Sequence, residues 1–148
     1  MSFLDKLKQT FWVENFNGTS ASKEYDFVLL LIRTAAAVFM MTHGYPKLEK
    51  LLAGGEIKFY NFMWTGPTVS LALCVVGELV APLFIILGYR FKLATVLIVY
   101  TMFIAAFGAH FGDPFSEKEH SLIYFLLFIL LNQTGPGKYS LGYFLSKK

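Results

Sequence analysis

The sequence has little cysteine and little charge. Cys74 is the only cysteine in 148 residues, which excludes a disulfide-stapled module and a Cys-x-x-Cys redox pair. Charged residues make up 16% of the chain, against about a quarter in an ordinary soluble domain. The 13 basic and 10 acidic residues are scattered, and no basic run exists that could neutralise a nucleic-acid backbone. We therefore expect no nucleic-acid partner.

Apolar residues are abundant instead. The chain is 55% hydrophobic and 18% aromatic, with a mean hydropathy of +0.53. A soluble domain of this length could not bury so many apolar residues in its own core. We therefore expect a lipid bilayer around the chain. A membrane-spanning helix needs about 20 mainly apolar residues. Four stretches meet or approach this length, namely about 27–42, 66–87, 91–111 and 121–131, the last extendable to 133. The sequence thus predicts an all-α integral membrane four-helix bundle.

The chain divides into three parts by composition. Residues 1–24 combine an amphipathic segment, predicted to lie as a helix in the membrane interface, with a polar linker. Residues 25–134 hold the four predicted spans, and residues 135–148 form a tail. The first apolar stretch begins behind 26 residues of mixed charge and contains Arg33, so we interpret it as a retained helix rather than a cleaved signal peptide.

Basic residues predict the orientation. Eight of them lie in the N-terminal segment, the second loop and the tail, and four lie in the first and third loops. Because short cytoplasmic loops are enriched in Lys and Arg, both termini are expected in the cytoplasm, with 43–63 and 112–120 external. The predicted location is the bacterial cytoplasmic (inner) membrane.

An ordered set of motifs lies within these predicted helices and at their ends. They are His43-Gly44-x-x-Lys47-Leu48, Glu78, Gly88-x-Arg90, His110 and Gly135-Pro136-Gly137-x-Tyr139-Ser140-Leu141. In this order the chain resembles the DoxX family over about residues 26–141, although Gly142 stands where the family commonly has an acidic residue. The resemblance implies a four-helix membrane subunit of an oxidoreductase. Family members include a thiosulfate:quinone oxidoreductase and a component of a complex linked to oxidative stress and thiol defence.

Two ionisable residues lie inside predicted spans. An isolated charge at a helix centre costs about 2.5 to 3.5 kcal/mol on insertion scales, so Arg33 and Glu78 are predicted to pair or to share one polar site. The pair could be purely structural or could handle protons. Pro82 removes the hydrogen-bond donor that would serve the Glu78 carbonyl, which predicts a bend in the helix beside the acid.

Four further residues form a candidate site near the outer face. His43 and His110 are predicted to end two outward-running helices, with Lys47 one turn beyond and Glu119 in the third loop. Such a cluster suits hydrogen bonding to a quinone headgroup and proton exchange, with the two histidines as the cofactor-binding pair. Alternatively these residues only anchor helix ends. Haem ligation by the two histidines is a weaker hypothesis, and no metal site is expected because Cys74 is predicted to lie remote from both.

The small residues Ala105, Gly108, Ala109 and Gly112 predict close packing within the bundle or, as a second option, an oligomer contact. The chain has no dinucleotide-binding glycine fingerprint, so a partner subunit or a bound cofactor must supply electrons. The predicted function is a membrane component of a redox system, contacting quinone near the outer face. The alternatives are a non-catalytic assembly or anchoring subunit and a proton or small-solute carrier.

Overall fold

The computed structural model describes residues 23–147, and all of its regular structure in that range is helical. The expected interfacial helix therefore lies outside the described residues, and the end of the expected linker, Lys23 and Glu24, already belongs to the first described helix. The elements in chain order are α2 (Lys23–Ala53), the 3-10 turn η1 (Phe62–Trp64), α3 (Pro67–Val75), the π-helical turn η2 (Val76–Val80), α4 (Ala81–Leu87), α5 (Phe91–Ile104), the π-helical turn η3 (Ala105–Ala109), α6 (Phe115–Thr134) and α7 (Leu141–Ser146).

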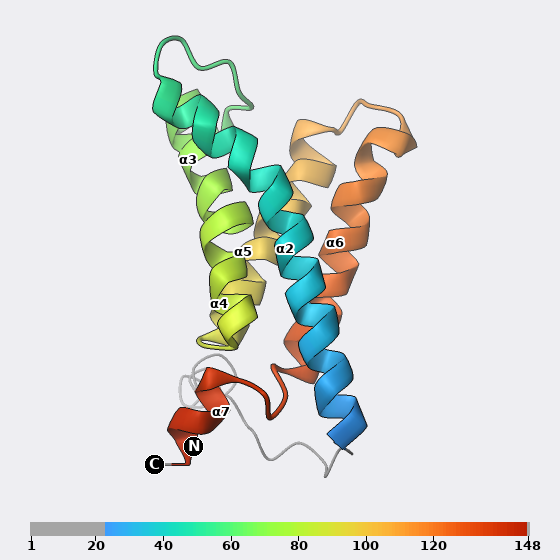
Figure 1. The fold of residues 1–148 in the computed structure, drawn as a ribbon. Coiled ribbons are helices and arrows are strands. Elements are labelled where there is room, and N and C mark those ends of the chain that lie inside the picture. Colours follow the sequence, from blue (N-terminus) through green and yellow to red (C-terminus); the bar gives the residue numbers. More distant parts are fainter. Residues whose placement is uncertain (1–22, 148) are drawn as a thin grey trace, which may run out of the picture.

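These elements form four rods that pack into a bundle (Figure 1). The first rod is α2, and the second is the continuous series α3, η2 and α4. The third is α5 continued by η3, and α6 packs along it as the fourth. The short helix α7 lies at the end of the bundle where α2 begins, whereas residues 54–66 lie at the opposite end (Figure 1).

Three of the four rods are long and apolar enough to cross a membrane, namely Lys23–Ala53, Pro67–Leu87 and Phe91–Ala109. The fourth predicted span does not meet the same criteria of apolar length and mean hydropathy, so it is not confirmed. Residues 115–134 do form a helix of 20 residues. Its first turns carry Glu117, Lys118, Glu119 and His120, and these charged and polar residues lower its mean hydropathy. The all-α class is confirmed.

The bundle is apolar on its surface and partly polar inside. Large hydrophobic side chains such as Phe39, Leu126 and Leu130 are more than half exposed, which suits contact with lipid chains rather than water. Arg33, Glu78 and Thr95 are buried, at 1%, 1% and 0% exposure. Between them lies an apolar core that includes Met40, Ile85, Phe91, Ile98 and Phe128. Such a distribution is typical of membrane proteins, whose interior polar groups must find partners within the protein.

The first helix differs from the sequence prediction, whereas the second agrees with it. The first helix does not end near His43 but continues through Pro46 to Ala53. The second contains the π-helical turn η2 next to Pro82, which confirms a local irregularity beside Glu78. At that turn α2 crosses very closely, because a Cβ added to Gly44 would lie 2.8 Å from the backbone carbonyl of Glu78. Glycine is therefore required at the crossing point.

Candidate functional site

Arg33 lies at the end of the bundle that holds α7. One of its terminal nitrogens donates to the Pro136 carbonyl at 2.6 Å, and the other donates to the carbonyls of Tyr139 and, at 3.5 Å, Ile86. The acceptors come from α4 and from the Gly-Pro-Gly-Lys-Tyr-Ser segment that follows α6. Arg33 therefore fastens this segment to the bundle by binding its backbone.

Neighbouring residues also attach the segment after α6 to the bundle. Gly88 has a φ of 62°, and a Cβ on it would meet Ser140 Cβ at 2.4 Å and Arg33 Nη1 at 2.5 Å. The Gly88 carbonyl accepts a hydrogen bond from Gly142 N–H at 3.1 Å. Asp26, also buried, accepts from Lys138 N–H at 3.0 Å. Only glycine provides both the left-handed backbone and the space at position 88.

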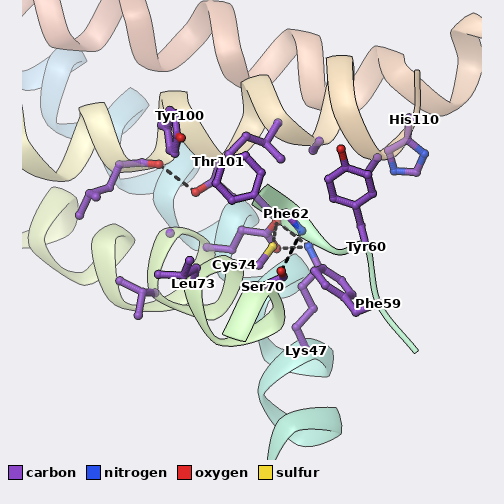
Figure 2. Close-up of a pocket in the computed structure, with 17 residues that line it drawn as sticks. Lys47, Phe59, Tyr60, Phe62, Ser70, Leu73, Cys74, Tyr100, Thr101 and His110 are labelled. Carbon is purple, nitrogen blue, oxygen red and sulfur yellow. Dashed lines mark hydrogen bonds and ion pairs between the residues drawn. The ribbon is translucent and has the colours of Figure 1, made fainter. Parts of the chain in front are cut away.

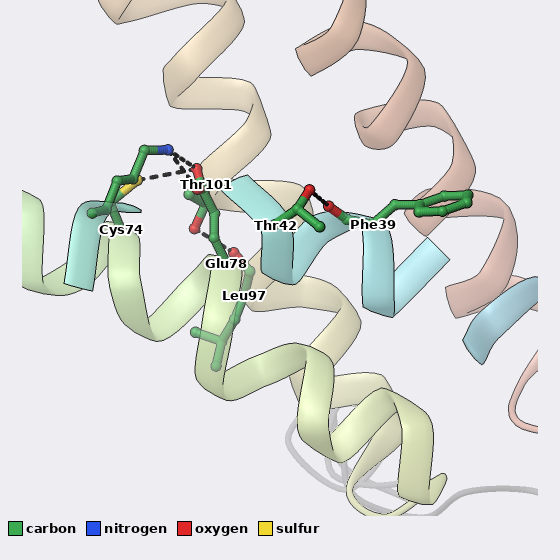
Figure 3. A network of polar contacts seen from close by, with 7 residues as sticks. Phe39, Thr42, Cys74, Glu78, Leu97 and Thr101 are labelled. Carbon is green, nitrogen blue, oxygen red and sulfur yellow. Dashed lines mark hydrogen bonds and ion pairs between the residues drawn. The ribbon is translucent and has the colours of Figure 1, made fainter. Parts of the chain in front are cut away.

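Glu78 has different partners. The Lys47 ammonium donates to both of its carboxylate oxygens, and the Cys74 thiol donates to Oε1 at 3.2 Å (Figure 3). The Glu78 side chain is 2% exposed, whereas that of Lys47 is 30% exposed. A buried carboxylate is thus neutralised by a cation that reaches it from the neighbouring helix.

The predicted Arg33–Glu78 pair is therefore wrong: the two residues bind different partners. The reason is depth along α2. Gly44, which touches the Glu78 backbone, lies 11 residues beyond Arg33, about 16 Å along a straight helix. Because α2 continues past His43, it brings Lys47 rather than Arg33 to the level of Glu78.

A cavity of about 440 Å³ adjoins the Lys47–Glu78 pair (Figure 2). Its walls come from the α3–η2 rod, from α5 and η3, and from residues 59–62 of the loop after α2. The lining is mainly apolar, with a few polar groups that include Lys47, Glu78, Cys74, Thr101, Tyr60 and His110. Leu73, Val76, Leu97 and Tyr100 line the cavity and also belong to the exposed apolar surface. The cavity is therefore open to the surface that faces lipid.

Ser70 holds the loop over this cavity. Its hydroxyl accepts from Phe62 N–H at 2.9 Å and donates to the Gly66 carbonyl at 2.8 Å, and Ser70 is itself buried. The Phe62 ring meets Tyr100 edge-on, with 5.9 Å between ring centroids. The Tyr60 hydroxyl lies against Gly108, where an added Cβ would be 3.0 Å away. The loop is thus fastened to both walls.

The small residues predicted to pack helix against helix lie in and beside η3, which packs against α6. Ala105 and Ala109 also line the cavity, and Gly108 makes room for Tyr60. Their small size therefore also leaves space for the cavity and for the loop at the end of α5. Cys74 and His110 line the same cavity, whereas His43 does not. Among residues 23–147 no group of three or more His, Cys, Asp or Glu is arranged to hold a metal ion.

The four residues of the predicted outer cluster do not all lie at one site. Lys47 and His110 line the cavity, whereas His43 and Glu119 do not. His43 is exposed and its ring packs edge-on against Tyr124 of α6, with 5.7 Å between centroids. Glu119 is exposed on α6. The prediction that His43 and His110 share one pocket is therefore wrong, because the His43 ring packs against α6 outside the cavity.

Sequence reasoning missed Asp113, Tyr60 and Thr101. Nδ1 of His110 lies 2.7 Å from Asp113 Oδ2 in a half-exposed pair. The i,i+3 spacing of His110 and Asp113 could have signalled this contact. No sequence signal placed Tyr60, because the course of residues 54–66 depends on the tertiary contacts of Ser70 and Gly108.

The comparisons with known proteins agree with the fold. A model of the DoxX family matches residues 28–111, which is more than half of the chain. The inner membrane protein YphA of Escherichia coli (strain K12) is 29% identical over 124 residues, covering 77% of this chain and 87% of the relative. No solved structure matches the chain. With its three candidate spans and this family match, the chain is an integral membrane protein that belongs to the DoxX family.

Proposed function

We propose that this chain is the quinone-contacting membrane component of a redox system in the bacterial inner membrane. The observation that carries the proposal is the cavity beside Lys47 and Glu78, which is apolar, lined by a few polar groups and open to the lipid-facing surface. Its volume of about 440 Å³ lies within the range of roughly 300–1,000 Å³ typical of small-molecule sites. A lipid-soluble ring with two carbonyl oxygens suits these dimensions and this lining.

Two residues of the cavity supply hydrogen bonds to such a ring. The Lys47 ammonium has three donors, and its bonds to the two Glu78 oxygens leave one for a ligand carbonyl. His110 lines the opposite part of the cavity, so it is placed to contact the second carbonyl (Figure 2). Lys47 and His110 would thus orient the headgroup between them.

Protons can leave the site through His110. Conversion between quinone and quinol moves two electrons and two protons, and a partner subunit's electron carrier exchanges the electrons. The His110 ring faces the cavity and also contacts Asp113, and both side chains are 40% or more exposed. A half-exposed imidazole that contacts a carboxylate can exchange protons between the cavity and water.

Quinone binding tests the proposal with a matched pair of histidine variants. The purified protein would be titrated with a short-chain ubiquinone analogue, and co-purified quinone would be measured by mass spectrometry. His110→Leu should weaken binding about tenfold, as expected for a lost hydrogen bond of roughly 1.4 kcal/mol. His43→Leu is the control, because His43 lies outside the cavity. No binding by the wild-type protein, or equal losses in the two variants, would reject the proposal.

The alternative is a non-catalytic assembly or anchoring subunit. The Arg33 site favours it, because there a buried charge serves only to hold backbone carbonyls of the same chain. In that case the Lys47–Glu78 pair would also be structural. Native mass spectrometry of gently purified material would then find partner subunits but no quinone.

A further inference from the structure

A second cavity lies at the end of the bundle opposite the first. It has a volume of about 510 Å³ and is lined by residues from the start of α2, from the segment after α6 and from α7. The lining residues are Lys23, Asp26, Lys138, Tyr139, Tyr143, Phe144 and Lys147. Three lysines against one aspartate give this cavity a net positive lining.

Its single acidic residue is already neutralised. Asp26 forms an ion pair with Lys138 at 3.5 Å and accepts the Lys138 backbone N–H. Lys23 and Lys147 are exposed, and the Lys147 ammonium lies 4.7 Å from the centre of the Tyr143 ring. Lys23 and Lys147 thus line the cavity and are also exposed, so an anion that enters from water can reach their positive charge.

Apolar side chains surround the same site. On α7, Leu141, Phe144 and Leu145 are exposed, and their i, i+3, i+4 spacing places them on one face. Phe144 also lines the cavity, so the apolar face of α7 is continuous with the lysine cluster. An exposed apolar face next to lysines and tyrosines is the arrangement of elements that lie in the headgroup region of a membrane.

We propose that this cavity binds the phosphate headgroup of an anionic phospholipid, with the apolar face of α7 inserted among the acyl chains. Lys23 and Lys147 contact the phosphate, and Tyr139 and Tyr143 contact the glycerol region. The location agrees with the proposal, because α2 begins at this end and a lipid headgroup layer lies at the ends of spanning helices (Figure 1). Basic pockets at helix ends are known sites for anionic lipid headgroups.

The test compares two lipids on the full chain. Detergent-purified protein would be titrated with phosphatidylglycerol and with phosphatidylethanolamine, and bound lipid would be counted by native mass spectrometry. The wild-type protein should prefer phosphatidylglycerol. The double variant Lys23→Gln/Lys147→Gln should lose about thirtyfold of that preference, since it removes two lysines that attract an anionic headgroup. It leaves the Asp26–Lys138 ion pair intact.

A matched control removes the same charge elsewhere. Lys50→Gln/Lys58→Gln changes two lysines at the opposite end of the bundle and should keep the lipid preference. Phe144→Ser should weaken phosphatidylglycerol binding but leave binding of glycerol phosphate unchanged, because it removes only the acyl contact. Equal affinity of the wild-type protein for both lipids, an equal loss in the control, or inorganic phosphate binding as tightly as the lipid would overturn the proposal.

Discussion

Arg33 and Glu78 are both buried, at 1% exposure each, yet their surroundings differ in kind. Arg33 binds backbone carbonyls from two segments of the chain, and it does not line the cavity beside Lys47 and Glu78. Glu78 binds two side chains, Lys47 and Cys74, at the wall of an apolar cavity. Arg33, whose partners are backbone carbonyls, stabilises the fold. Glu78, whose partners are titratable side chains next to a ligand-sized cavity, can also contribute to ligand binding or proton transfer.

Loss of Arg33 should have the largest effect on stability. Arg33→Leu leaves the carbonyls of Pro136 and Tyr139 without their donor inside the bundle, and the segment that leads to α7 loses its attachment. We expect a loss of about 2 to 5 kcal/mol, because each of the two carbonyls left without its donor costs about 1 to 3 kcal/mol. Thermal unfolding and membrane yield would measure it. Stability within 1 kcal/mol of the wild type would show that this stabilising role is wrong.

A double-mutant cycle should separate the two charges. Lys47→Met and Glu78→Gln should be non-additive, with a coupling of about 1 to 3 kcal/mol, because each removes the partner of the other. Arg33→Lys combined with Glu78→Gln should be additive within about 0.5 kcal/mol, since they share no partner. Unfolding of all single and double variants gives both couplings. A measured coupling between positions 33 and 78 would instead support the Arg33–Glu78 pair that the sequence predicted.

Glycine 88 tests the packing around Arg33. Gly88→Ala combines a positive φ with a clash against Ser140 Cβ and Arg33 Nη1, so we expect a loss of about 1 to 3 kcal/mol. Gly54→Ala is the control, because its φ is also positive but nothing lies within 4 Å of an added Cβ. The difference in melting temperature between the two variants isolates the clash. Equal losses would show that only backbone strain matters at position 88.

Cys74 should have the smallest effect. Its thiol gives Glu78 one weak hydrogen bond beside the stronger contact from Lys47, so Cys74→Ala should change stability by about 1 kcal/mol or less. Thermal unfolding of the wild-type protein and of Cys74→Ala would measure the difference. A loss well above 1 kcal/mol would show that the thiol contributes more than one weak hydrogen bond.

The sequence predicted the elements better than their contacts. Apolar length located three spans, and the proline at position 82 located the irregular turn beside Glu78. Periodicity could not show that α2 continues past His43, because Gly44 and Pro46 are ordinary end signals for a helix. The extension keeps Lys47 on α2 at the level of Glu78, so Lys47 rather than Arg33 is the partner of that carboxylate.

The candidate site was predicted in part. Lys47 and His110 were named from their motifs, and both line the cavity. Tyr60 and Thr101 were missed, because a loop tyrosine and a helical threonine have no distinctive pattern in one sequence. Asp113 was missed although its i,i+3 spacing from His110 is a usable signal. The sequence also did not show that Gly108 makes room for Tyr60, because that contact depends on the course of the loop after α2.

The sequence by itself determined the membrane environment and the helical class, because the number and run length of apolar residues depend on no other part of the chain. It also determined that Arg33 and Glu78 need partners, since an isolated charge is costly in lipid. Only the tertiary structure decided which partners they have. Partner choice depends on how far each helix continues and on where glycines allow two backbones to approach, and both are settled by packing between segments far apart in the sequence.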